Sequence, residues 1–131
     1  MPAENTAQKK ILIADDESMV REVLKLILTR AGYAIAEAPD GAEAVRQFAA
    51  APDQFALVLV DRHMPGLPGQ EALARMRQID PQLKAIVFSG EMAAELEAEP
   101  AADSHTRWLD KPFDNSDLLR QVRELLAGVS P

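Results

Sequence analysis

The chain has 131 residues, of which 47% are hydrophobic, and a net charge of −7. Its length and hydrophobic content suit one domain with one core. Its negative charge argues against direct binding of nucleic acid or of an anionic membrane. It contains no cysteine, which excludes disulfides and thiolate metal sites and favours a cytoplasmic protein. No apolar run approaches the roughly 20 residues of a membrane span, and the first residues lack a signal-peptide pattern, so we expect no membrane contact.

The first half of the chain alternates between predicted strands and predicted helices. Residues 11–14 and 33–36 form short apolar runs that predict strands. Between them lies one apolar stripe at helical spacing, ended by Gly32, which comprises Val20, Val23, Leu24, Ile27, Leu28 and Ala31. Asp40 then begins a second predicted helix, with Glu43 three residues later as in a capping box. The buried face of this helix is predicted to comprise Val45, Phe48 and Ala49.

The second half of the chain continues the same alternation. Strands are predicted at 55–60, 83–88 and 107–109. Helices are predicted after the loop 65–69, at about 92–98, and after Asp114. The apolar residues expected to face the core from the first and last of these helices are Leu73, Met76, Ile79, Leu118, Val122, Leu125 and Leu126. Strand and helix thus alternate five times, which predicts an α/β domain with a parallel sheet.

Polar side chains follow four of the predicted strands. Asp15 and Asp16 follow the first, Asp61 the third, Ser89 the fourth and Lys111 the fifth. Alone, Asp61 would be an ordinary turn residue before Pro and Gly, but the ends of parallel strands meet at one edge of a sheet. Three carboxylates at one edge repel each other unless a cation joins them, and oxygen ligands suit Mg²⁺. The lysine and the serine suit a bound phosphoryl group.

These motifs resemble the receiver domain of two-component response regulators, over roughly residues 9–128. Each motif alone is weak, but their order and their places at strand ends are specific; they are Ile13–Glu17, Val60–Asp61, Met64–Gly66 with Gly69, Phe88–Gly90 and Lys111–Phe113. The resemblance implies a (βα)5 doubly wound, flavodoxin-like domain whose parallel sheet has the strand order 2-1-3-4-5. It leaves residues 1–8 as a flexible tail and 129–131 as a short C-terminal tail.

The resemblance also implies a phosphorylation chemistry. Asp61 would accept a phosphoryl group from a phosphohistidine on a sensor histidine kinase or a phosphotransfer protein. Lys111 would pair with one phosphoryl oxygen, and Ser89 would donate a hydrogen bond to another. The chain would thus be a phosphoacceptor that assists its own phosphotransfer and autodephosphorylation, rather than an enzyme for a separate substrate.

The cofactor implied by the resemblance is Mg²⁺. Asp16, Asp61 and the backbone carbonyl of His63 would hold the ion directly, whereas Asp15 would act mainly through metal-bound water. The ion neutralises charge that would otherwise repel the incoming phosphoryl group. The side chain of His63 is more simply explained as an exposed loop residue than as a group that orients a hydrolytic water.

The family's switch involves the hydroxyl residue, here Ser89, and an aromatic side chain on the fifth strand. Trp108 stands at that aromatic position, where Tyr or Phe is usual, and it is equally explained as a partly buried aromatic on an edge strand. Phosphorylation would bias two arrangements of the face made by the fourth helix, the fifth strand and the last helix. That face would contact a protein target that the sequence does not identify, and Pro100 with the polar run 103–106 makes it atypical.

Three functions are compatible with this fold. A signalling switch without an output domain is favoured, either as a stand-alone regulator or as one domain of a larger protein such as a hybrid histidine kinase. A receiver-shaped binding module is disfavoured because the acidic, hydroxyl and lysine residues are all present. An enzyme on a similar fold is also disfavoured: a phosphatase of this type would have Asp where His63 stands, and Asp15–Glu17 would repel the phosphate of a flavin.

Overall fold

A computed structural model of the chain describes residues 9–89 and 105–128. Five strands form one sheet: β1 (Lys10–Ala14), β2 (Ala34–Ala38), β3 (Phe55–Asp61), β4 (Lys84–Ser89) and β5 (Thr106–Asp110). All neighbouring strands pair in parallel, in the order β2-β1-β3-β4-β5. The predicted strand order is therefore confirmed, and the C-terminal ends of all five strands lie at one edge of the sheet.

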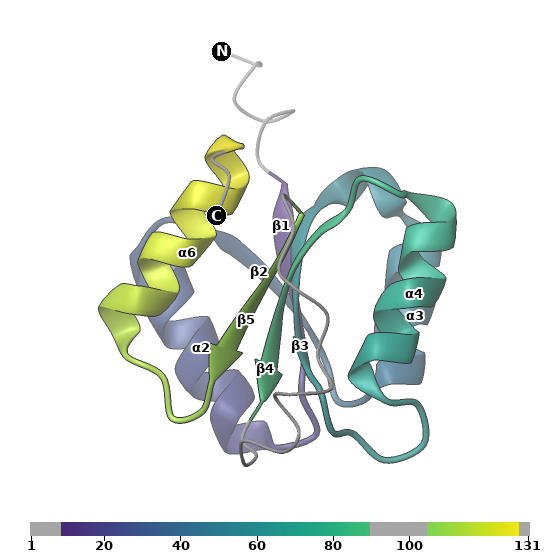
Figure 1. Cartoon of the computed structure of the whole chain (residues 1–131), viewed down its shortest axis with the longest axis horizontal. Coiled ribbons are helices and arrows are strands. Elements are labelled where there is room, and N and C mark those ends of the chain that lie inside the picture. Colours follow the sequence, from purple (N-terminus) through teal and green to yellow (C-terminus); the bar gives the residue numbers. More distant parts are fainter. Residues whose placement is uncertain (1–8, 90–104, 129–131) are drawn as a thin grey trace.

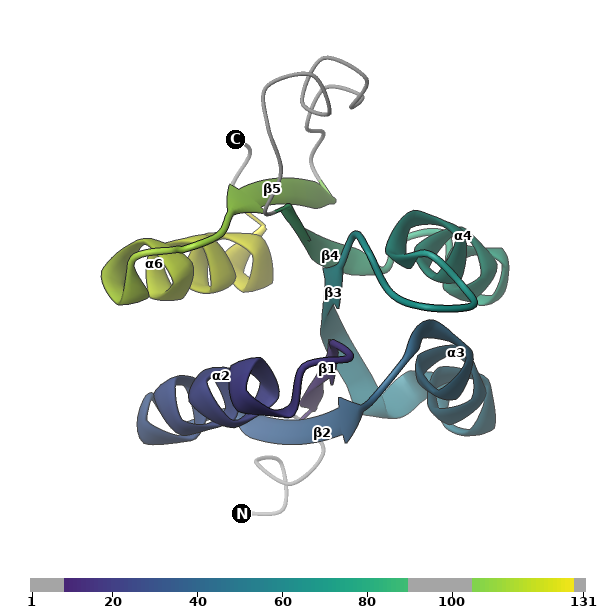
Figure 2. The same cartoon turned by 90° about the horizontal axis from the view of Figure 1, so that it is seen from below.

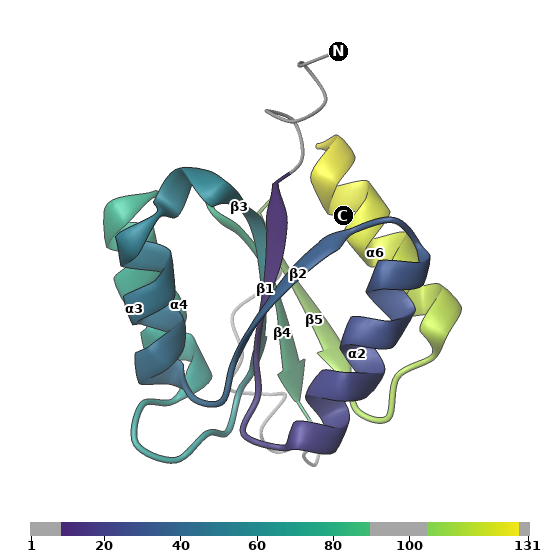
Figure 3. The same cartoon turned by 180° about the vertical axis from the view of Figure 1, so that it is seen from behind.

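Helices cover both faces of the sheet, as a doubly wound fold requires. They are α2 (Ser18–Arg30), α3 (Gly41–Ala50), α4 (Gly69–Ile79) and α6 (Asn115–Ala127), with a short 3-10 turn, η1 (Pro52–Gln54), before β3. Figures 1 and 2 show α2 and α6 on one face and α3 and α4 on the other, and the view from behind in Figure 3 shows the same division. The helix predicted at 92–98 lies outside the described residues, as do the two tails.

The three central strands are buried on both faces. Alternate residues point to opposite sides of a strand, so Val58 and Val60 of β3 join the core under α3 and α4, whereas Leu57 and Leu59 join the core under α2 and α6. All four residues are fully buried. This explains why β3 is an unbroken apolar run in the sequence, which is typical of central strands in parallel sheets.

The N-terminus of α3 is capped as its sequence predicts. Asp40 accepts a hydrogen bond from the backbone N–H of Glu43 at 2.8 Å, which satisfies one of the free donors at the start of the helix. The Glu43 carboxylate itself accepts hydrogen bonds from Arg46 and Gln47. These contacts lower the pKa of Glu43 to about 2, mainly through the hydrogen bond from Arg46.

Four residues predicted to face the core are exposed instead. Ala31, Ala49 and Ile79 stand in or just after the last turn of their helices, so the apolar stripe continues in the sequence beyond the length that packs against the sheet. The fourth is Val23 of α2, which is 49% exposed. It lines a surface groove together with Phe113, so its apolar side chain packs outside the core.

Candidate phosphorylation site

The structure brings the predicted polar residues to the same edge of the sheet. Asp61 is the last residue of β3 and Ser89 the last of β4, while Asp15 and Lys111 directly follow β1 and β5. Asp15, Asp61 and Ser89 are buried, Lys111 is partly buried and Asp16 is exposed. The site therefore combines side chains held inside the protein with one carboxylate that faces solvent.

The ammonium of Lys111 contacts carboxylates at the ends of two different strands, β1 and β3. Its Nζ lies 2.9 Å from Asp15 Oδ2 and 3.4 Å from Asp61 Oδ1. The backbone N–H of Lys111 also donates to the carbonyl of Ser89 at 2.8 Å, which fixes the start of the loop after β5. One ammonium thus serves two carboxylates that come from positions far apart in the sequence.

Local hydrogen bonds hold Asp15 in place. Its Oδ1 accepts from the backbone N–H of Glu17 at 2.9 Å, in the manner of an Asx turn. Its backbone carbonyl accepts from Arg21 Nη1 at 2.7 Å. Because both ends of the residue are bonded, the carboxylate oxygen that meets Lys111 has a fixed direction. No motif in the sequence predicts this role of Arg21, which lies one turn into α2.

The three carboxylates of the site can share one cation. Asp15, Asp16 and Asp61 each offer an oxygen, and these three oxygens lie within 4.8 Å of one another. Carboxylate oxygens are the preferred ligands of hard divalent cations such as Mg²⁺. Within residues 9–89 and 105–128, this is the group of carboxylates and histidines whose geometry suits a metal ion. The exposed side chain of His63 stands outside the group, as expected for a loop residue.

Burial and neighbouring charges both shift the pKa values of Asp61 and Lys111. Burial raises the pKa of Asp61, and repulsion from Asp15 and Asp16 raises it further, against the lowering effect of Lys111. Burial alone would lower the pKa of Lys111, but its contacts with Asp15 and Asp61 outweigh burial and raise it. By geometry, one ammonium faces three carboxylates, and a divalent cation would complete the balance.

The backbone at the end of β3 is held by two hydrogen bonds and by a glycine. The N–H of Arg62 donates to the carbonyl of Phe88 at 2.8 Å, and the N–H of Gly69 donates to the carbonyl of Arg62 at 3.1 Å. A Cβ on Gly69 would lie 2.1 Å from the carbonyl oxygen of Asp61. The first residue of α4 must therefore be glycine for the helix to seat against Asp61. The sequence motif contains Gly69 but does not reveal this contact.

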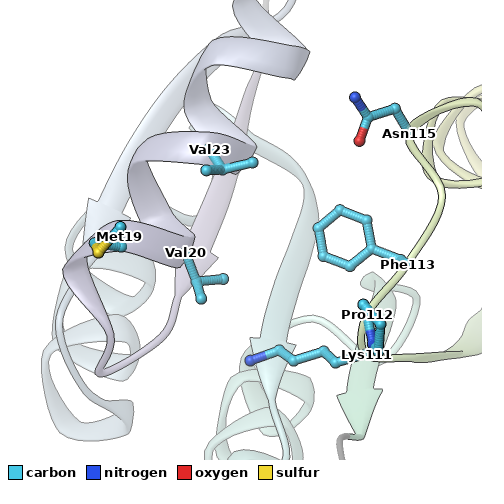
Figure 4. A pocket seen from close by; sticks show the side chains of 7 residues that line it. All are labelled: Met19, Val20, Val23, Lys111, Pro112, Phe113 and Asn115. Carbon is cyan, nitrogen blue, oxygen red and sulfur yellow. The ribbon is translucent and has the colours of Figure 1, made fainter.

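An apolar groove lies beside Lys111 at the same edge. Its volume is about 470 Å³, and it is lined by Met19, Val20, Val23, Lys111, Pro112, Phe113 and Asn115. Figure 4 shows the ring of Phe113 pointing toward α2, opposite Val20 and Val23. Met19 is 79% exposed at the rim. Apolar surface thus continues from the charged site onto the outside of α2.

Trp108 occupies a half-buried position in the middle of β5. It packs against the core on the α3 and α4 face, and the guanidinium carbon of Arg62 lies 5.8 Å from the centre of its ring. This position fits a partly buried aromatic on an edge strand. The role of Trp108 as a switch stays a prediction.

Comparison with known proteins identifies the family. The family model described as "Response regulator receiver domain" matches residues 11–123. The chain belongs to this family. The response regulator receiver protein CpdR of Brucella abortus is 34% identical over 118 residues, covering 90% of this chain and 97% of CpdR. The chemotaxis protein CheY of Thermotoga maritima is 36% identical over 121 residues, covering 89% of this chain and 97% of CheY.

Solved structures agree with the family assignment. The crystal structure of the response regulator protein TrrA from Thermotoga maritima, in complex with Mg²⁺-BeF, superposes with a TM-score of 0.75 at 31% identity. The alignment covers 89% of this receiver domain and 98% of TrrA. The predicted resemblance, fold and family are therefore confirmed.

The receiver domain belongs to two-component signalling, and receiver domains are signalling switches. Its acidic pocket of Asp15, Asp16 and Asp61 is typical of phosphorylation sites in this family. Family membership favours a switch over the phosphatase and flavoprotein alternatives. In the part of the chain that the structure describes, no helix has the length and apolar character needed to cross a membrane.

Proposed function

We propose that residues 9–128 form a phospho-accepting switch in which Asp61 is the phosphoacceptor. The observation that carries the proposal is the shared ammonium: Lys111 lies 3.4 Å from Asp61 and 2.9 Å from Asp15 at the end of the central strands. A buried carboxylate with a cation beside it and further carboxylates opposite is suited to phosphoryl transfer, which depends on positioning and on charge stabilisation.

In the proposed reaction, a carboxylate oxygen of Asp61 attacks the phosphorus of a phosphohistidine. The new P–O bond replaces the P–N bond, the electron pair of the broken bond goes to the imidazole nitrogen of the donor, and that nitrogen takes a proton from solvent. Lys111 turns from the Asp61 carboxylate to a phosphoryl oxygen while it keeps its contact with Asp15. Ser89 donates a hydrogen bond to a second phosphoryl oxygen. Later attack of water on the acyl phosphate returns free Asp61 and inorganic phosphate.

The residues present fit Mg²⁺ as a cofactor, since oxygens of three carboxylates lie within 4.8 Å of one another. Asp16, Asp61 and the backbone carbonyl of His63 would hold the ion, and Asp15 would contact its water. When bound, Mg²⁺ supplies positive charge against the phosphoryl oxygens. The Mg²⁺-BeF complex of TrrA supports this choice of cofactor.

The proposed donor is a protein, either a sensor histidine kinase or a phosphotransfer protein. The groove beside Lys111 supports this, because its apolar lining and the exposed Met19 offer a macromolecular partner more surface than a small donor needs. Met19→Lys should slow phosphotransfer from a phosphorylated donor protein while the reaction with acetyl phosphate is unchanged. Equal slowing of both reactions would place the defect in the site instead.

The proposed response passes through Ser89 and Trp108 to a protein target. Ser89 is buried at the end of β4, and Trp108 lies on the neighbouring strand, where it pairs with Val87 in the sheet register. Movement of the hydroxyl toward the phosphoryl group would change the packing around this ring. The face formed by β5 and α6, together with the helix expected at 92–98, would then present two arrangements to its target.

The test of the phosphoacceptor is the Asp61→Asn variant, with Asp53→Asn at an exposed turn as its matched control. Each protein is incubated with acetyl phosphate and Mg²⁺, and acid-labile phosphate is measured by intact mass. Wild type and the control should gain one phosphate and Asp61→Asn none. Stoichiometric acid-labile phosphate on Asp61→Asn would refute the assignment. A wild type that binds neither Mg²⁺ nor beryllium fluoride would instead be a receiver-shaped binding module.

A further inference from the structure

The side chain of Arg62 connects the phosphoacceptor strand to Trp108. Arg62 is the first residue after β3, and its guanidinium carbon lies 5.8 Å from the centre of the Trp108 ring on β5. Val58 and Val60 of β3 face α3 and α4, as Trp108 does, and strand alternation places Arg62 on that same face. The contact therefore crosses the end of β4 and links two strands that are not neighbours in the sheet.

The base of the Arg62 side chain is fixed to the site. Its backbone N–H donates to the carbonyl of Phe88, and its carbonyl accepts from the N–H of Gly69. Arg62 also follows Asp61 directly, so any shift of the phosphoacceptor backbone moves its Cα. A guanidinium over an indole face is attracted by the ring quadrupole, and tryptophan is the aromatic residue that gives the strongest contact of this kind. Movement at the end of β3 is thereby passed to the ring.

No hydrogen bond to the described residues fixes the position of the Trp108 ring. Trp108 Nε1 is buried, and among the described residues it has no hydrogen-bond partner. Burial of an indole N–H without a partner is unfavourable. A second position in which this N–H reaches water or an acceptor therefore competes with the observed one, and the contact with Arg62 opposes that change.

We infer that Arg62 is a positioning residue for Trp108: its cation–π contact holds the indole in the half-buried position and couples that position to the phosphoacceptor strand. The coupling rests on the proposed function, because it assigns a regulatory role to the residue beside Asp61. The positioning of the ring in the resting protein is independent of phosphorylation. Family membership alone does not supply this contact, which needs a cation at position 62 beside the aromatic ring at position 108.

The resting protein gives the first test. Trp108 is the only tryptophan of the chain, so its fluorescence reports the ring directly. Arg62→Met keeps an unbranched apolar stem but removes the guanidinium, and Arg75→Met is the control at an exposed arginine that pairs with Glu71 on α4. Acrylamide should quench Arg62→Met more strongly than wild type, with its emission shifted to the red. Arg75→Met should match wild type, and Arg62→Lys should restore most of the protection.

Quenching and emission of Arg62→Met equal to those of wild type would overturn the inference. Far-ultraviolet circular dichroism is recorded for each variant, so that a change caused by unfolding is recognised. If Arg62→Met does not fold, Arg62→Lys and Arg62→Gln are compared by the same quenching measurement.

The second test measures the coupling by titration with beryllium fluoride in the presence of Mg²⁺. A contact of this kind at a partly exposed site corresponds to a change of about two- to fivefold in an equilibrium constant. Removing it should make the ring easier to displace, so Arg62→Met should be half-saturated at about two- to fivefold lower beryllium fluoride than wild type. An unchanged concentration in a variant whose resting ring has moved would overturn the coupling. A wild type that gives no response would remove the proposed function, while the resting quenching data still judge the contact.

Discussion

The buried carboxylates at the centre of the sheet are paired, whereas two buried polar groups on its outer strand are not paired with any described residue, although Arg107 of that strand bonds to Gln121 and Glu124. At the centre, Asp15 contacts Lys111 and the N–H of Glu17, and Asp61 also contacts Lys111. On the outer strand β5, Thr106 Oγ1 and Trp108 Nε1 are buried and have no hydrogen-bond partner among the described residues. Both regions lie in one sheet, in which strand β4 lies between β3 and β5.

In the proposed switch, this difference would separate the site that is phosphorylated from the strand that responds. Paired groups on central strands have one favoured arrangement, which suits a site that must hold reacting atoms in place. Unpaired buried groups are unfavourable and leave room for a second arrangement. Under the proposed function, a phosphoryl group on Asp61 would change the balance at the outer strand without disturbing the fold.

The largest effect of a substitution is expected at Gly69, where the start of α4 lies against the end of β3. In Gly69→Ala the new Cβ would lie 2.1 Å from the Asp61 carbonyl oxygen, so the start of α4 or the end of β3 must move. We expect a loss of about 3 kcal/mol in the free energy of unfolding. We also expect phosphorylation to be about 100-fold slower, because a displacement of this size misplaces the reacting carboxylate. Urea denaturation and a phosphorylation time course measure the two effects.

Gly66 provides the matched control for Gly69. It adopts φ +83° in the same loop, but a Cβ there would have no neighbour within 4 Å. Gly66→Ala should cost only the backbone strain of that φ, about 1–2 kcal/mol, and should leave phosphorylation near the wild-type rate. If the two alanine variants behave alike, the close approach of Gly69 to Asp61 has no special importance for the site.

A smaller loss is expected when the charge at the centre is removed. Lys111→Met leaves Asp15, which is 1% exposed, and Asp61 without their cation. We expect a loss of about 2 kcal/mol at neutral pH without Mg²⁺, and a larger rise in melting temperature on adding Mg²⁺ than wild type shows. Because the pKa of Lys111 is raised, its contribution is fully present below pH 10.5 and is lost as the pH rises through the raised pKa.

Lys25→Met is the control for charge alone. Lys25 pairs with Glu37 on the surface, and its side chain is 54% exposed, so its removal should change stability by less than about 0.5 kcal/mol. Thermal unfolding of both variants with and without Mg²⁺ makes the comparison. An equal response of the two lysine variants to Mg²⁺ would mean that Lys111 does not share the site of the ion.

The third effect has the opposite sign and concerns Asp61 itself. Its pKa is raised in the folded protein by burial and by repulsion from Asp15, so the folded state binds a proton more tightly than the unfolded state does. The ionised carboxyl thus destabilises the fold at neutral pH, and this penalty disappears as the pH falls through the raised pKa toward 3.8. Without Mg²⁺, Asp61→Asn should be more stable than wild type at pH 7, and the gap should close as the pH approaches 4.

Urea denaturation midpoints of wild type and Asp61→Asn across this pH range measure the effect. Addition of Mg²⁺ at pH 7 should stabilise wild type more than the variant, because the ion binds the folded carboxylates. A difference in stability between wild type and Asp61→Asn that grows toward low pH would contradict a raised pKa for Asp61.

The fold was predictable because its signals are local and repeated. The central strands are buried on both faces, so their apolar runs stand out in the sequence, as Leu57–Val60 shows. Helix ends were less predictable: Ala31 and Ile79 continue an apolar stripe past the part that packs. Sequence periodicity records which residues share a helix face, but it does not record where the neighbouring element ends.

The candidate site was predictable as a set of residues at strand ends, but its internal geometry was not. Parallel pairing brings Asp15, Asp61 and Lys111 together, and this follows from topology alone. The support from Arg21, the close approach of Gly69 and the contact between Arg62 and Trp108 depend on side-chain directions and on distances of a few ångströms. No spacing in the sequence encodes these contacts.

The smallest effect is expected on the outer strand, where Thr106 carries a buried hydroxyl without a partner among the described residues. Thr106→Val replaces that hydroxyl by a methyl group of similar size and keeps the β-branched shape that suits a strand. The variant should gain about 1 kcal/mol in the free energy of unfolding, because a buried unpaired hydroxyl is removed.

Thr29→Val is the control, since Thr29 Oγ1 donates to the carbonyl of Lys25 at 2.7 Å on the surface. This variant should be neutral or slightly destabilising. Urea denaturation of both variants measures these changes in the free energy of unfolding. A destabilised Thr106→Val would show that the hydroxyl is bonded, and the outer strand would then hold its polar groups as firmly as the centre does.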